Sequence, residues 1–126
     1  MDTIWMARGS CANTDPKVFF PHDGIGVALD VYHIWWDPEI AAQIERAGKE
    51  RLLAFHVCDW MSPTQDMLTD RGMMGEGVID IPAFRSMVEA QGFDGLVEVE
   101  IFSAANWWTK PGDDVLKAMV GALPAI

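Results

Sequence analysis

Three apolar runs of strand length, each with charged residues at or near its end, divide most of the chain into repeating units. They cover residues 26–30, 52–57 and 96–102. After each run comes a segment in which apolar residues recur every three or four positions, the spacing of an amphipathic helix. The order is therefore strand, helix, strand, helix, strand, helix. It predicts an α/β fold with parallel strands joined by helical crossovers, as in a barrel or a doubly wound sheet.

The predicted helices carry start and stop signals. Asp37 can cap the first helix, and Gly48 can end it. Pro82 suits the first turn of the second helix, which Gly92 closes. Residues 59–80, which separate the second strand from this helix, are polar and contain several glycines, so we interpret them as a loop. An apolar stripe predicts the last helix: Val115, Leu116, Met119 and Val120.

The beginning of the chain follows a different pattern. Pro16, Pro21 and Gly24 interrupt it, and no helical period survives across it. We therefore expect an irregular N-terminal segment over residues 1–25 and one α/β domain over residues 26–126.

Charged residues stand at the end of each predicted strand. In parallel α/β folds the strand ends share one edge, where catalytic and binding groups gather. Neighbouring strands lie about 5 Å apart, so Asp30, His56 and Glu100 could converge on one divalent ion. Two carboxylates and an imidazole suit Mn²⁺, Mg²⁺, Co²⁺ or Zn²⁺ without choosing among them. Glu98 alternates with Glu100 and should share its face.

Each of these residues also has an ordinary structural interpretation. Asp30 alone could be a cap or turn residue, and His56 alone could be a hydrogen-bonded core histidine. Glu100 is harder to explain in this way, because an unpaired buried carboxylate within an apolar strand is costly. Three such residues at three successive strand ends favour a site over coincidence.

Two further residues near the predicted edge could take part in chemistry. Arg71, ahead of Gly75 and Gly77, could hold a hydroxyl, carboxylate or phosphate of a ligand, or could be an ordinary surface arginine. Cys58 lies close to His56, but we expect apolar neighbours around it and interpret it as a buried thiol.

Charge and composition narrow the function classes. Nine basic residues stand against nineteen acidic ones, a formal net charge of −10, which disfavours binding to nucleic acids or to anionic membranes. Two cysteines do not make a disulfide framework, so a reducing, cytoplasmic setting is the default interpretation. Five tryptophans fall just beyond apolar runs and could form either a pocket wall or core filling: Trp35, Trp36, Trp60, Trp107 and Trp108.

The motifs DVYH, HVCDW, DRGMMGEGVID and GFDGLVEVEIFS together resemble the C-terminal half of sugar phosphate isomerases/epimerases with a xylose isomerase-like TIM barrel. The resemblance covers about residues 26–120 and implies three consecutive βα units of such a barrel. It implies that Asp30, His56 and Glu100 bind a divalent metal and that His33 and Arg71 contact the substrate. Glu100 would also be an acid/base, which makes Glu98 the less favoured of the two glutamates.

The implied reaction is metal-dependent proton transfer next to the carbonyl of a sugar or polyol-type substrate, through an enediolate. The family uses two glutamates, and the first belongs to an earlier strand. Nothing before Gly26 resembles such a strand, and a whole barrel takes about 250 residues. We therefore expect a truncated form with reduced or no isomerase or epimerase activity by itself. The alternatives are a metal-dependent dehydratase of the same superfamily and a non-catalytic half-barrel that self-associates into a homo-oligomer.

Overall fold

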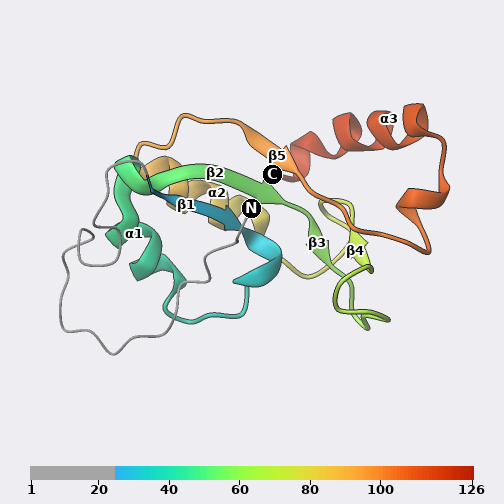
Figure 1. Ribbon diagram of the computed structural model, residues 1–126, viewed down its shortest axis with the longest axis horizontal. Coiled ribbons are helices and arrows are strands. Elements are labelled where there is room, and N and C mark those ends of the chain that lie inside the picture. Colours follow the sequence, from blue (N-terminus) through green and yellow to red (C-terminus); the bar gives the residue numbers. More distant parts are fainter. Residues whose placement is uncertain (1–24) are drawn as a thin grey trace.

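The computed structural model describes residues 25–126, and its centre is a parallel sheet of three strands. The strands are β1 (Val27–Asp30), β2 (Leu52–Val57) and β5 (Val97–Val99), in the spatial order β1-β2-β5 (Figure 1). Each strand pairs in parallel with the next strand of the repeating pattern. The α/β architecture with parallel strands is therefore confirmed. No helix within residues 25–126 has the length and apolar character that crossing a membrane requires.

The register of the sheet places the polar strand ends in one row. Asp30 pairs with His56, and His56 pairs in turn with Glu98 on the other side. Since side chains alternate between the two faces of a strand, residues at equivalent register positions project from the same face. The sheet therefore presents its polar row on one face while its apolar residues face the other way.

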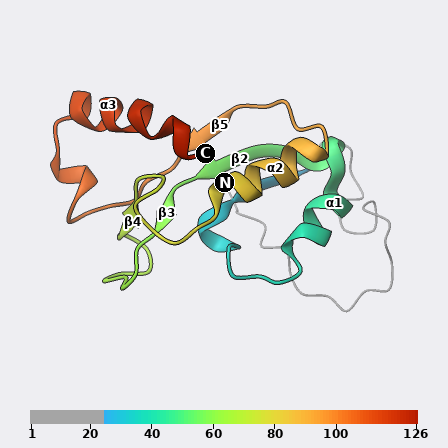
Figure 2. The same cartoon turned by 180° about the vertical axis from the view of Figure 1, so that it is seen from behind.

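Two helices cover the apolar face, as seen from behind in Figure 2. They are α1 (Ile40–Arg51), which contacts β2 and α2, and α2 (Ile81–Ala90). The buried core between the helices and the sheet includes Leu29, Phe55, Val57, Ile44, Phe84 and Val88. Asp80 accepts a hydrogen bond from the Ala83 amide and so caps α2, which begins one residue before the predicted Pro82.

The structure corrects three details of the sequence interpretation. Asp37 caps the amide of Glu39 in the turn ahead of α1, and the helix itself begins only at Ile40. The third strand is shorter than predicted and spans Val97–Val99, although the Glu100 amide still donates a hydrogen bond to the Val57 carbonyl of β2. The loop over residues 59–80 contains two short antiparallel strands, β3 (Asp59–Trp60) and β4 (Arg71–Gly72).

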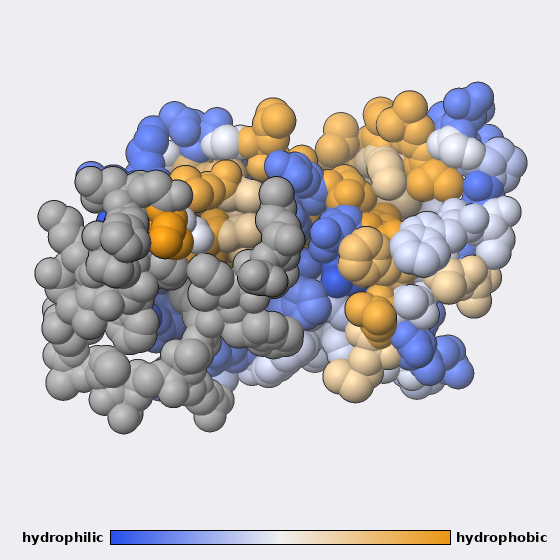
Figure 3. Space-filling view, in the orientation of Figure 1, coloured by the Kyte–Doolittle hydropathy of each residue, from blue (hydrophilic) through white to orange (hydrophobic). Residues whose placement is uncertain are grey.

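The predicted last helix is present as α3 (Gly112–Ala122), but its apolar stripe is only partly used. The helix extends beyond the end of the sheet in Figures 1 and 2. Val115 and Met119 pack against the core, whereas Leu116 and Val120 are exposed. Apolar surface accordingly gathers over α3 in Figure 3.

Candidate metal centre

Asp30, His56 and Glu100 converge at the carboxyl edge of the sheet. One ligand atom from each lies within 4.8 Å of those of the other two. Asp30 ends β1, His56 lies near the end of β2, and Glu100 follows directly after β5. Three adjacent parallel strands thus bring together three residues that are up to 70 positions apart. This proximity is the geometry that the sequence pattern predicted for these side chains.

The two oxygens of Asp30 have different partners. Oδ1 accepts a hydrogen bond from the Tyr32 amide at 2.9 Å, which caps the short 3₁₀ helix Val31–His33. Oδ2 faces the sheet edge and lies 3.0 Å from Nη1 of Arg71. Asp30 is therefore both a cap, as its ordinary interpretation predicted, and a member of the cluster. The cap fixes the direction in which the carboxylate points.

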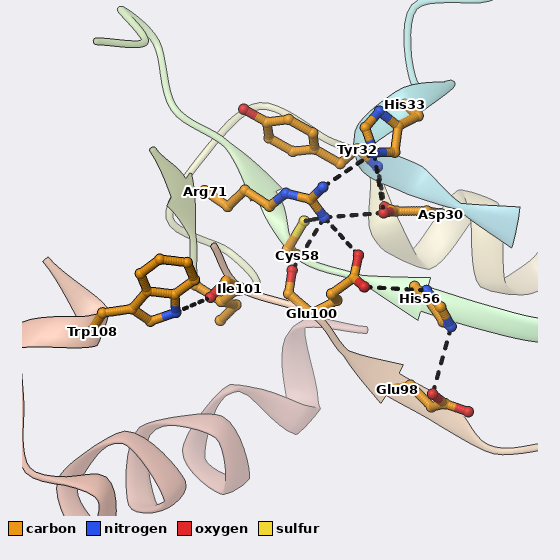
Figure 4. A network of polar contacts seen from close by, with 10 residues as sticks. All are labelled: Asp30, Tyr32, His33, His56, Cys58, Arg71, Glu98, Glu100, Ile101 and Trp108. Atoms are coloured by element: carbon orange, nitrogen blue, oxygen red, sulfur yellow. Dashed lines mark hydrogen bonds and ion pairs between the residues drawn. The ribbon is translucent and has the colours of Figure 1, made fainter. Parts of the chain in front are cut away.

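Arg71 lies at the centre of the network, as Figure 4 shows. Its Nη1 donates to Oδ2 of Asp30 and, at 2.9 Å, to Oε2 of Glu100. Its Nη2 lies 3.1 Å from Nε2 of His33. The side chain is only 2% exposed, so the interpretation as a surface arginine is wrong. Burial opposes the charge of the guanidinium, but Asp30, Cys58 and Glu100 together raise the pKa of Arg71 above its ordinary value.

Aromatic rings hold this guanidinium in place. Its central carbon lies 4.4 Å from the ring centroid of Tyr32 and 4.6 Å from that of Phe102. Cation–π contacts of this kind are stronger when both partners are removed from water. Nε of Arg71 is buried without a hydrogen-bond partner among residues 25–126. Packing and the two carboxylates, rather than complete hydrogen bonding, therefore fix the position of Arg71.

Asp59 organises the loop that carries Arg71. Its carboxylate is 1% exposed and accepts hydrogen bonds from the amides of Trp60, Gly75 and Ile79. A side chain at Gly77 would collide with the Trp60 carbonyl and with the Asp59 carboxylate, so this position requires glycine. The sequence showed Asp59 three positions after His56 but gave no sign of this role. An aspartate directly after an apolar strand and ahead of a glycine-containing loop is the sequence signal that could have indicated this anchoring role.

Glu98 also reaches His56, from the side away from the cluster. Its Oε2 lies 3.5 Å from Nε2 of the imidazole, whereas Oε1 of Glu100 lies 4.0 Å from Nδ1. His56 is thus flanked by Glu98 of β5 and by Glu100, which follows directly after that strand (Figure 4). The cluster that could hold a metal ion includes Glu100 and not Glu98.

Four aromatic rings form a group in which Trp60 contacts the other three at tilted or edge-on angles. Trp60 lies 4.8 Å from Tyr32, 5.9 Å from Trp35 and 5.7 Å from Trp36 between ring centroids. Trp36 is half exposed, and Trp35 and Trp60 are partly buried. Trp107 is buried in the core and Trp108 is exposed, so the five tryptophans do not share one role.

Cys58 is fully buried in the hydrophobic core, as predicted, but it also has a charged neighbour. Its Sγ lies 3.8 Å from Nη1 of Arg71. Burial raises the pKa of the Cys58 thiol to about 12, with a further contribution from the negative charge of Asp30 and an opposing one from Arg71. The thiol is therefore neutral at physiological pH and is a poor nucleophile.

We expect Cys58 to resist thiol reagents in the folded protein. In a Cys11→Ser background, Ellman's reagent at pH 8 should label Cys58 only after denaturation; rapid labelling of the native protein would contradict this.

The raised pKa of Cys58 also makes stability depend on pH. The folded thiol keeps its proton up to a pKa of about 12, whereas the unfolded thiol loses it around 9.0. The unfolded state thus binds fewer protons in this window, and Cys58 makes stability decrease as the pH rises above 9.0.

The donor set fits a divalent ion. Two carboxylates and one imidazole are ligands that Mn²⁺, Co²⁺ and Zn²⁺ accept, and three protein ligands leave a coordination position open for a further oxygen ligand. The separations within 4.8 Å require only small side-chain movements to reach a common ion. Asp30 is almost fully buried, so its charge needs a nearby cation. Arg71 supplies one, and a metal ion bound by these residues would supply another.

Comparisons with known proteins identify the family. The sequence profile of the xylose isomerase-like TIM barrel family matches residues 18–123, and the chain belongs to this family. A segment of 82 residues is 28% identical to inosose isomerase from Bacillus subtilis (strain 168), and the inosose isomerase of Halalkalibacterium halodurans matches equally well. The matched segment is 64% of this chain and 30% of the Bacillus protein.

Solved structures show the same fold. Protein SMc04130 from Sinorhizobium meliloti 1021 is 57% identical and superposes with a TM-score of 0.81 over 84% of this chain and 39% of its own. The IolI protein with a bound zinc atom is 21% identical, with a TM-score of 0.70 over 84% of this chain and 38% of its own. The chain thus spans well under half the length of these relatives and supplies part of a barrel.

Proposed function

We propose that this chain carries the metal-binding part of a divalent-metal-dependent sugar or polyol isomerase or epimerase. The convergence of Asp30, His56 and Glu100 within 4.8 Å supports this proposal most directly. The similarity to inosose isomerases and to the zinc-binding IolI protein points in the same direction. A small hydroxylated ketone or aldehyde is the substrate class that this chemistry suits.

In this proposal Asp30, His56 and Glu100 hold the ion. A bound divalent ion would polarise the substrate carbonyl and stabilise the negative charge that develops on its oxygen. Glu100 is 34% exposed and Asp30 only 5%, so Glu100 is the carboxylate that a substrate can approach. Glu100 would remove and return the proton on the carbon next to the carbonyl, as a general base and then a general acid.

His33 and Arg71 orient the substrate in this proposal. Nε2 of His33 lies within hydrogen-bond distance of the Arg71 guanidinium, and both border the Asp30 carboxylate. The guanidinium offers several donors in a fixed plane, which suits neighbouring hydroxyl and carbonyl oxygens. The aromatic rings of Trp36 and Trp60 would give the apolar face of a sugar or polyol a surface to lie on. Glu100 is the acid/base group that we assign among residues 25–126. Epimerisation needs a second acid/base group, which would come from outside residues 25–126.

Metal content tests the proposal. Purified protein should bind about one equivalent of Mn²⁺, Co²⁺ or Zn²⁺ after equilibrium dialysis, measured by inductively coupled plasma mass spectrometry. His56→Ala should weaken metal binding by more than about 100-fold, because it removes a direct ligand. Even the loss of a residue that only hydrogen-bonds to a ligand weakens metal binding about 10–100-fold.

His33→Ala is the matched control. It removes an imidazole at the same sheet edge but not a proposed ligand, so metal content should stay close to that of the parent protein. Circular dichroism should show that both variants are folded. If His56→Ala retains the metal, the proposed site is wrong.

A further inference from the structure

The two nitrogens of His56 face two different glutamates. Nδ1 faces Oε1 of Glu100 on the side of the metal-binding cluster, and Nε2 faces Oε2 of Glu98 at 3.5 Å. Figure 4 shows the imidazole between the two carboxylates, with Glu98 beyond the ring from Asp30. The arrangement follows from the sheet, because Glu98 pairs in register with His56 and alternation puts Glu100 on the same face.

This geometry separates the roles of the two glutamates. The lone pairs of the two imidazole nitrogens point in diverging directions, so an ion bound through Nδ1 lies away from Glu98. Glu98 therefore faces Nε2 at 3.5 Å, from where a small rotation of its side chain would let it accept a hydrogen bond from Nε2–H, and it is not placed to join Asp30 and Glu100 as a ligand. A carboxylate in that position selects the tautomer with a free Nδ1, fixes the orientation of the ring and makes Nδ1 more basic.

We propose that Glu98 is a positioning residue that prepares His56 to bind the metal through Nδ1. The inference rests on the proposed metal centre and adds to it the binding atom of His56 and the residue that selects this atom. Glu98 is 56% exposed, so it acts with little support from the core. Replacement of Glu98 should leave the fold intact, because within residues 25–126 its side chain makes no polar contact other than the one with His56.

The first measurement is metal affinity in three proteins. The Kd for Co²⁺ should rise about 10–100-fold in Glu98→Ala. In Glu98→Gln the rise should be smaller, because the amide oxygen still accepts a hydrogen bond but lacks the negative charge. Glu50→Gln removes one exposed negative charge on α1 and should leave the Kd unchanged, which controls for long-range electrostatics.

The second measurement distinguishes positioning from direct ligation. The visible spectrum of the Co²⁺-loaded protein should keep its shape in Glu98→Gln, because the ligands are unchanged, and should change in His56→Ala. In the metal-free protein, ¹⁵N chemical shifts of the His56 ring should report mainly the Nε2–H tautomer. Glu98→Ala should shift the ring toward a mixture of both tautomers, a change that a merely structural role would not produce.

The results separate failure of the inference from failure of the metal site. If His56→Ala leaves Co²⁺ binding unchanged, the proposed centre itself is wrong. If His56→Ala abolishes binding while Glu98→Ala changes neither Kd nor tautomer, only the role of Glu98 is wrong. If Glu98→Gln alters the Co²⁺ spectrum as strongly as His56→Ala does, Glu98 is a ligand, which also overturns the inference.

Discussion

Replacement of Arg71 by methionine should destabilise the metal-free protein by about 3–5 kcal/mol, the usual cost of removing one partner from a buried ion pair. Methionine preserves much of the side-chain volume between Tyr32 and Phe102 but leaves Asp30 without its neighbouring cation. Asp30 is 5% exposed and cannot recover that interaction from water. Urea denaturation in the presence of a chelator would measure the loss as a change in the free energy of unfolding.

The same substitution should make stability depend strongly on the metal. In the parent protein, Arg71 contacts Oδ2 of Asp30, so a metal ion bound at the proposed site would share the Asp30 carboxylate with the guanidinium or displace it. In Arg71→Met the ion would bind the carboxylates of Asp30 and Glu100 without competition from the guanidinium. Saturating Zn²⁺ or Mn²⁺ should therefore restore more stability to the variant than it adds to the parent, by the linkage between binding and folding.

Arg85→Met is the matched control for Arg71. Arg85 forms an exposed pair with Glu89 on the same helix, and such pairs contribute little to stability. Its loss should change neither the free energy of unfolding nor the metal dependence appreciably. Equal stabilisation of Arg71→Met and the parent by metal would show that Arg71 and the ion do not compete for Asp30.

Asp59→Ala should cost more than about 4 kcal/mol, because it removes the acceptor of three backbone hydrogen bonds at a buried position, and bonds to charged groups contribute about 1.5–3 kcal/mol each. The segment that follows β4 would also lose the anchor that Asp59 gives it through the Gly75 and Ile79 amides, close to Arg71 in the chain. Thermal and urea denaturation would measure the loss of stability, and metal affinity would report the disturbance at the cluster.

Asp66→Ala is the control for this effect. Asp66 also accepts hydrogen bonds from the amides of Leu68 and Thr69, and these bonds lower the pKa of its carboxyl group. Asp66 is exposed, so water replaces those bonds after the substitution, and the change in stability should be much smaller. Comparable losses for Asp59→Ala and Asp66→Ala would mean that burial of the Asp59 carboxylate is not what matters.

The elements with strong local signals could be predicted from the sequence. The apolar run Leu52–Val57 became β2 with the same bounds, because six consecutive residues of suitable type follow directly after the end of α1. The short strands β3 and β4 escaped prediction, since a pair of two-residue strands carries no periodicity. Likewise, the apolar stripe of α3 predicted a helix but not that Leu116 and Val120 would remain exposed.

The spacing of apolar and charged residues is enough to predict which residues stand at the strand ends, and therefore that Asp30, His56 and Glu100 share an edge of the sheet. Their orientations and their partners follow from the packing of segments that lie far apart in the chain. Arg71 is far from Asp30 and Glu100 along the chain, and its burial between them depends on a loop anchored by Asp59. Glu98 and Glu100 share one face by alternation, and they are distinguished by the two sides of the His56 ring that they face and by the contact of Glu100 with Arg71. Periodicity encodes the face of a strand, whereas side-chain partners arise from contacts between distant segments.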